Sequence, residues 1–213
     1  MASSMIHLAI TQCLIPEIGC GDDFRLRLGA ILPDGAIQGN AHLKKQVGEN
    51  RITYDLEFFR RRYRVQMETD GLYLGYYLHL IQDIFYRNFL YTQRHWDPTP
   101  PGNVERLHRD YEILNGYVAQ KFHLYPEMLR SIPIAREPIA ELAVFDGEGL
   151  IREVRQQFAD TPEGEPFFFT REMADTYIAD AVALCRRELQ DLQTGAGLDS
   201  LDWSWTGHVL PAP

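Results

Sequence analysis

The residues best suited to chemistry in this sequence are a histidine and an aspartate inside a very apolar segment. His79 and Asp83 lie four residues apart in "LYLGYYLHLIQDIFYR" (72–87). In a helix, residues at i and i+4 share one face, so the two side chains are neighbours. A buried carboxylate without a partner is strongly unfavourable. The pair alone leaves two interpretations open: a hydrogen bond within the core, or two ligands of a buried metal ion.

Three further residues favour the metal. His7 stands in the apolar stretch "IHLAI", Asp34 follows a helix end at "ILPD", and His42 lies in the loop "GNAHLKK". Imidazole and carboxylate groups together suit a borderline or hard divalent cation. Facing helices of a bundle commonly supply such ligands. We therefore predict a buried metal site formed by His7, Asp34, His42, His79 and Asp83.

A second pair with helical spacing occurs in "ERLHRDYEILNGY", where His108 and Glu112 are four residues apart. Asp110 stands beside them on a different face, and Asn115 follows one turn later. This segment is more polar than the first, so an exposed His–Glu face is the alternative interpretation. We treat His108, Asp110, Glu112 and Asn115 as additional candidates for metal or substrate binding.

Composition narrows the class of protein. A net charge of −9 argues against a nucleic-acid-binding protein, because phosphate contacts require a basic surface. The three cysteines, Cys13, Cys20 and Cys185, form no C-x-x-C pair, which favours a reduced intracellular protein. The first residues lack the features of a signal peptide. Polar residues interrupt the apolar segment 72–91, which argues against membrane insertion. We expect a cytoplasmic protein. The oligomeric state is not predicted from the sequence.

The hydrophobic period is helical along most of the chain. We predict one all-α domain over residues 1–213, a bundle of about seven helices with a buried metal site. Residues 34–52 and the tail from residue 195 are expected to be loops, and a hairpin around "DGEG" (146–149) is the less favoured alternative to a helix there. The expected helices cover about residues 4–15, 24–32, 54–66, 71–94, 104–122, 150–160 and 171–193. The residues expected to cap the starts of these helices are Ser3 or Ser4, Asp22-Asp23, Thr53 and Asp55, Thr69-Asp70, Asn103 and Thr170.

The ordered motifs resemble one known family. "IHLAI", "LGAILPD", "AHL" and "YLGYYLHLIQD" carry the five candidate ligands in order, and "RDYEILNGYVAQKF" and "FFFTREMADTYIADAVALCRREL" follow. Together they are similar to the zinc-dependent phospholipase C family, in its short bacterial intracellular branch. The resemblance covers most of the chain.

This resemblance implies an all-helical, phospholipase C-like fold with one to three Zn²⁺ ions, although the donor set also suits Mn²⁺ or Fe²⁺. Asp83 would bridge two ions, Asp34 and His42 would share one of them, and His7 would bind the adjacent one. Secreted members also use the amino group of an N-terminal tryptophan, whereas this chain begins Met-Ala-Ser-Ser.

The family's secreted members carry a further H-x-x-x-E pair, to which His108 and Glu112 correspond. His95 is the candidate for the additional histidine expected between the two pairs. A further metal position would require all of these matches.

The resemblance implies metal-dependent hydrolysis of a phosphoric ester, either a small molecule or a lipid-like substrate. Asp34 is the acidic ligand best placed in the sequence also to orient the attacking water. An HD-type phosphohydrolase is an alternative, but it requires an adjacent His-Asp dipeptide, which this sequence lacks. A non-enzymatic helical binding or scaffold protein, with the His–Asp pair as a structural contact, is the other alternative.

Overall fold

The computed structural model describes residues 2–19 and 21–206, and this part of the chain is mostly helical. The prediction of a mainly α-helical fold is therefore confirmed at the level of its class. The α-helices are α1 (Ser4–Ile18), α2 (Asp23–Ile31), α3 (Leu56–Thr69), α4 (Gly71–Arg87), α5 (Asn103–Lys121), α6 (Gly147–Ala159) and α7 (Arg171–Thr194). A π-helical segment, Asn88–Gln93, continues α4, and short 3₁₀ turns include η1 (Leu32–Gly35).

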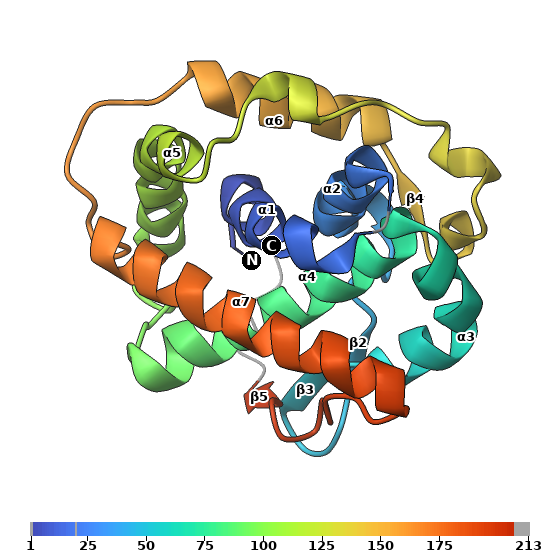
Figure 1. Cartoon of the computed structure of the whole chain (residues 1–213). Helices are drawn as coiled ribbons and strands as arrows, with labels where there is room; N and C mark the ends of the chain where they lie inside the picture. Colours follow the sequence, from blue (N-terminus) through green and yellow to red (C-terminus); the bar gives the residue numbers. More distant parts are fainter. Residues whose placement is uncertain (1, 20, 207–213) are drawn as a thin grey trace.

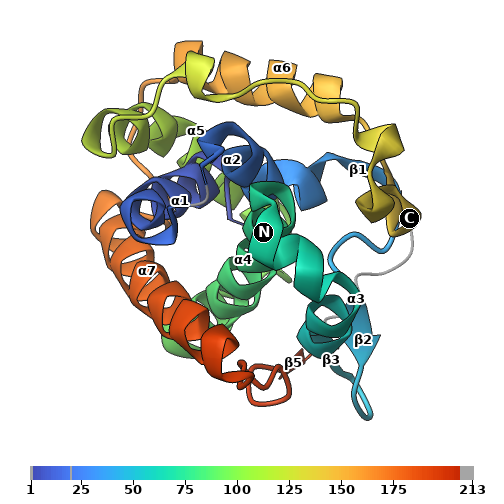
Figure 2. The same cartoon turned by 45° about the vertical axis from the view of Figure 1, so that its right-hand side comes forward.

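Helix α4 is the central element of the fold. It packs against α1, α2, α3 and α7, and Figures 1 and 2 show these helices around it. All of its residues from Gly71 to Tyr86 are buried, which explains why its sequence is apolar on every side. The buried apolar residues of the described chain join into one cluster around this helix. A polar side chain in the middle of α4 therefore lies far from bulk water.

Two glycines let α2 approach α4 unusually closely. A Cβ atom at Gly29 would lie 2.1 Å from the carbonyl oxygen of Leu72, and one at Gly75 would lie 2.1 Å from that of Leu26. No larger residue fits at either position without moving a backbone. This close approach brings the last turn of α2 against the face of α4 that carries His79.

Short strands replace the loop that we predicted for residues 34–52, so that prediction was wrong. The strands are β1 (Ala36–Gly39), β2 (Lys44–Gln46), β3 (Arg51–Tyr54), β4 (Ala143–Phe145) and β5 (Trp205–Thr206). They form two antiparallel sheets, β1–β4 and β2–β3–β5. Strands of two to four residues are too short to show an alternating pattern, and their partners β4 and β5 lie far away in sequence.

Most predicted helix starts are confirmed. Ser3, Asp22, Asp55, Asp70 and Thr170 each accept a hydrogen bond from a backbone N–H of the helix that follows.

Other predicted boundaries were wrong. Asn103 is the first residue of α5 and Gly102 holds the cap position, while Thr53 belongs to β3. Helix α1 passes Pro16 and ends at Ile18, and its cap Gly19 adopts a left-handed conformation (φ 59°) that glycine accommodates easily. Residues 150–159 belong to α6, so β4 does not pair with them to form the alternative hairpin.

None of the helices formed by residues 2–19 and 21–206 combines the length and apolar character that a membrane span needs. Cys13 and Cys185 are free thiols, and Cys20 lies outside the described residues.

Candidate metal centre

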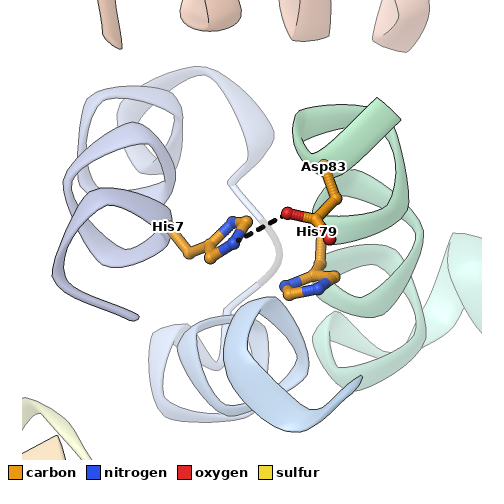
Figure 3. A group of neighbouring side chains, drawn as sticks. All are labelled: His7, His79 and Asp83. Atoms are coloured by element: carbon orange, nitrogen blue, oxygen red, sulfur yellow. Dashed lines mark ion pairs between the residues drawn. The ribbon is translucent and has the colours of Figure 1, made fainter. Parts of the chain in front are cut away.

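Helices α1 and α4 bring His7, His79 and Asp83 together in the core. All three residues are completely buried. The imidazoles of His7 and His79 stack with their centres 4.1 Å apart, and His7 Nε2 lies 3.6 Å from Asp83 Oδ1. Figure 3 shows the His7 ring projecting from α1 toward the two side chains of α4. Each residue offers one ligand atom, and these atoms lie within 4.8 Å of one another.

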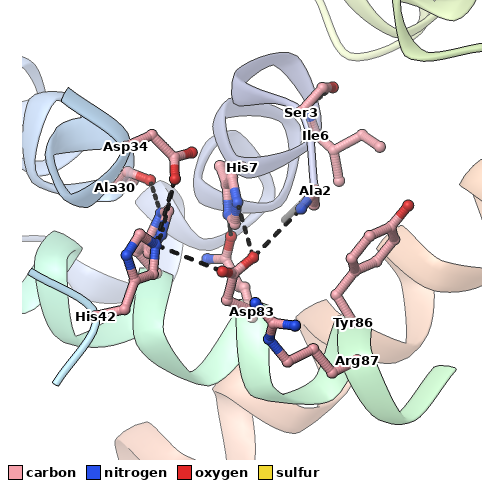
Figure 4. A network of polar contacts seen from close by, with 12 residues as sticks. Ala2, Ser3, Ile6, His7, Ala30, Asp34, His42, Asp83, Tyr86 and Arg87 are labelled. Atoms are coloured by element: carbon pink, nitrogen blue, oxygen red, sulfur yellow. Dashed lines mark hydrogen bonds and ion pairs between the residues drawn. The ribbon is translucent and has the colours of Figure 1, made fainter. Parts of the chain in front are cut away.

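Asp34 and His42 extend this group toward the surface. Asp34 comes from η1, directly after α2, and His42 comes from the turn between β1 and β2. His42 Nε2 lies 3.3 Å from Asp34 Oδ1, 3.5 Å from Asp83 Oδ2 and 3.2 Å from His79 Nε2. Asp34, His42 and His79 form a second group of potential ligands, and Figure 4 shows the wider network. All five residues predicted as ligands therefore meet in one place.

Hydrogen bonds at the Nδ1 atoms of His7 and His79 leave the Nε2 atom of each ring to face the cluster. His79 Nδ1 donates to the carbonyl oxygen of Ala30 at 2.8 Å, and His7 Nδ1 donates to Gln82 Oε1 at 2.7 Å. With a proton on each Nδ1, the Nε2 atom of each ring carries a lone pair whenever that ring is neutral. Among the described residues, no group satisfies His7 Nε2 or Asp34 Oδ1 by a hydrogen bond. The cluster thus holds more lone pairs than protons, an arrangement that a cation would satisfy.

The ligand atoms lie close enough together to hold a metal ion. Ligand atoms bound to zinc at their usual distances lie about 3.3 Å from one another. The closest pairs in the cluster range from 3.2 Å, between His79 and His42, to 3.7 Å, between His79 Nε2 and Asp34 Oδ1. The two oxygens of Asp83 face different partners, since Oδ1 lies near His7 and Oδ2 near His42. This carboxylate can therefore serve two adjacent positions.

The pKa shifts agree with an acceptor-rich cluster. Burial lowers the pKa of His79 to about 3, and the nearby His7 acts in the same direction, so the ring stays neutral. Burial opposes ionisation of Asp83, but its contact with His7 and the nearby His79 and His42 hold its pKa well below the usual range. Burial likewise opposes ionisation of Asp34, and His79 and His42 lower its pKa overall. Both carboxylates are therefore anionic near neutral pH.

The negative charge of Asp83 raises the pKa of His7. Burial alone lowers the pKa of His7, but the contacts with Asp83, together with Asp34 and Gln82, raise it overall. A cation that uses His7 Nε2 must therefore displace a proton from this ring when the ring is charged.

Sequence analysis missed the groups that support Asp83. The hydroxyl of Tyr54 donates to Asp83 Oδ2 at 3.2 Å and accepts from Arg87 Nε at 3.1 Å. The backbone N–H of Ala2 donates to Asp83 Oδ1 at 3.3 Å. Trp205 packs edge-on against Tyr54 and under the guanidinium of Arg87. Arg87 lies one turn beyond Asp83, which was a readable signal, whereas nothing local distinguishes Tyr54.

The second predicted pair lies apart from the buried cluster but near it. His108, Glu112 and Asn115 line a pocket of about 630 Å³ that Asp34 also lines. Burial lowers the pKa of His108. Neither group of potential metal ligands among the described residues includes His108 or Glu112.

The structure places the remaining candidates elsewhere. Both oxygens of Asp110 accept hydrogen bonds from the backbone N–H groups of residues 167–169, at 2.6–2.8 Å, so this carboxylate anchors a loop. His95 is exposed in the segment after Gln93.

Comparison of the chain with protein-family models, curated proteins and solved structures gives no match.

Proposed function

We propose that this protein is a metal-dependent hydrolase that cleaves a phosphoric ester, with zinc as its metal. One observation supports this proposal above the others: a buried cluster of three histidines and two aspartates, spaced like zinc ligands, adjoins a pocket of about 630 Å³ through Asp34. Pockets of this size accommodate small organic ligands. The similarity of the sequence motifs to the zinc-dependent phospholipase C family supports the same conclusion.

The donors divide naturally between two adjacent positions. His7, His79 and Asp83 Oδ1 would hold one ion, and Asp34, His42 and Asp83 Oδ2 the other. His79 Nε2 lies near both groups, but its single lone pair can bind one ion only. Zinc supplies Lewis-acid chemistry when bound, because it lowers the pKa of water and offsets negative charge on phosphoryl oxygens.

Asp34 is the residue of the cluster that also lines the pocket. Its side chain is 12% exposed, whereas those of His79 and Asp83 are completely buried. His79 and His42 keep its carboxylate ionised despite its burial. We propose that Asp34 accepts a hydrogen bond from the attacking water and holds it at the boundary between the cluster and the pocket.

Tyr54 and Arg87 would act through Asp83. The chain of hydrogen bonds from Arg87 to Tyr54 to Asp83 fixes the orientation of this carboxylate. Such supporting contacts usually determine how well a metal ligand is placed. The apolar residues of α4 exclude bulk water around the same groups.

We also propose a cytoplasmic location, which the free thiols of Cys13 and Cys185 support. With a net charge of −9, the partner is a small or lipid-like phosphoester and not a nucleic acid.

Metal content and hydrolysis test this proposal. The purified protein should contain Zn, Mn or Fe in a stoichiometric amount, measured by elemental analysis, and should hydrolyse bis-p-nitrophenyl phosphate. Chelation should abolish the activity, and zinc should restore it. The Asp83→Asn variant should lack both metal and activity. A folded protein that binds none of these metals would refute the proposal and favour a helical scaffold with a structural His–Asp contact.

A further inference from the structure

The pocket beside Asp34 has walls of a distinctive chemistry. Helices α5 and α6 and the start of α1 form most of it, and Figure 1 shows α5 to the left of the pair α1 and α2 and α6 above this pair. Few of its lining residues are apolar, chiefly Ala2, Tyr111 and Pro162. A pocket that receives acyl chains would instead be lined mostly by aliphatic and aromatic side chains.

Two amide oxygens in this pocket have no hydrogen-bond donor. Asn115 is only 3% exposed, and its Oδ1 accepts no hydrogen bond from any described residue. The same holds for Gln157 Oε1, which comes from α6 on the other wall. Buried acceptors are nearly always satisfied, so each of these oxygens requires a donor from a bound molecule or from water. The ligand should therefore carry N–H or O–H groups.

The charge of the lining restricts the ligand further. Glu112, Glu153 and Asp160 are acidic, while the single arginine, Arg109, is already paired with Glu112 at 2.8 Å. A second phosphate or a carboxylate on the ligand would meet this negative wall, whereas a neutral or cationic group would not.

We propose that this pocket binds the alcohol portion of a small, water-soluble phosphoric ester that carries hydroxyl or ammonium donors. This inference rests on the proposed hydrolase function, because the ester phosphate would then lie at Asp34. Asn115 and Gln157 accept hydrogen bonds from the alcohol portion, and the acidic residues favour its neutral or positive charge. Long acyl chains have no place in the pocket.

Three leucine variants test the role of the two oxygens. Asn115→Leu and Gln157→Leu replace the amide by an aliphatic group and so remove its oxygen acceptor. Gln120→Leu is the matched control, because Gln120 also lies on α5 but is exposed and does not line the pocket. The free energy of unfolding of Asn115→Leu should not fall, since the substitution removes an unsatisfied buried group. Thermal unfolding verifies this point, and Gln157→Leu provides a second test at a less buried position.

The probes are sn-glycero-3-phosphoethanolamine and vesicles of phosphatidylethanolamine, which share one head group. We expect the zinc-loaded protein to cleave the soluble diester with the higher kcat/KM. Asn115→Leu and Gln157→Leu should each raise KM about five- to tenfold, the effect of one lost hydrogen bond, with kcat unchanged and Gln120→Leu near the wild type. Saturation-transfer NMR should show contact of the soluble diester with the wild type and weaker contact with both acceptor variants.

The possible failures are distinguishable. Preferred cleavage of vesicles, with KM unaffected by either acceptor variant, overturns this inference and leaves the hydrolase function standing. No turnover of any phosphoester, combined with binding that depends on Asn115, refutes the hydrolase function and supports the recognition of the alcohol. The lack of both turnover and binding overturns both.

Discussion

The replacement of Asp83 by asparagine is the sharpest test of the metal centre. Asp83 is the one residue of the cluster whose two oxygens face both groups of potential ligands, through His7 at 3.6 Å and His42 at 3.5 Å. Asparagine keeps the size of the side chain but removes its charge. We therefore expect Asp83→Asn to fold and to lose zinc binding at both positions.

The magnitude follows from linkage and Coulomb's law. Zinc at about 100 times its Kd should stabilise the wild type by about 2.7 kcal/mol. For a chain of this length, that corresponds to a rise in Tm of about 5–11 °C. Removing a unit charge at about 4 Å from a divalent ion costs about 8 kcal/mol at an effective dielectric of 20, which weakens Kd by about six powers of ten. At the same zinc concentration, the stabilisation of Asp83→Asn should then fall below about 0.1 kcal/mol.

The assay is thermal unfolding of chelator-treated protein with and without zinc, together with calorimetric titration of the metal. Asp110→Asn is the matched control, because Asp110 is also a buried aspartate on a helix but binds backbone N–H groups of residues 167–169. This control should lower Tm in both conditions and keep the zinc-dependent rise. A zinc-dependent rise in Asp83→Asn equal to that of the wild type would show that our assignment of the ligands is wrong.

Three further outcomes are expected. Tyr54→Phe removes the hydroxyl that donates to Asp83, so zinc affinity, measured by competition with a chromophoric chelator, should fall about 10- to 100-fold; unchanged affinity would exclude this supporting role. In metal-free protein His79 stays neutral down to pH about 3, while the unfolded state binds a proton near pH 6.5, so its contribution to stability rises with pH between these values. Urea unfolding from pH 6.5 to 4.5 should show a slope smaller by about 1.4 kcal/mol per pH unit in His79→Gln, and equal slopes would contradict the shift. Gly75→Ala inserts a Cβ into the backbone of α2 and should destabilise by about 1–3 kcal/mol in urea unfolding, whereas Gly147→Ala, at the open start of α6, should be nearly neutral; similar losses in both would argue against the close contact.

The sequence by itself determined the helical class and the ligand candidates. Helix α4 was readable because its apolar run, the cap at Asp70 and the i, i+4 spacing of His79 and Asp83 are local properties. His7 was readable for a different reason, since an imidazole is unexpected in an apolar segment, whereas His42 stands in a loop and became a candidate only beside the other four residues. The polar pair on α5 was also visible, although its sequence did not reveal that it lines a pocket with Asp34.

Only the tertiary structure decided how these groups meet. The short strands were not predictable, because β1 and β4 pair across more than a hundred residues and each is too short to show a period. Tyr54 reaches Asp83 because β3 ends beside α4, and the carbonyl of Ala30 reaches His79 because two glycines allow α2 and α4 to touch. These contacts depend on distances between segments far apart in the chain, and local sequence carries no measure of such distances.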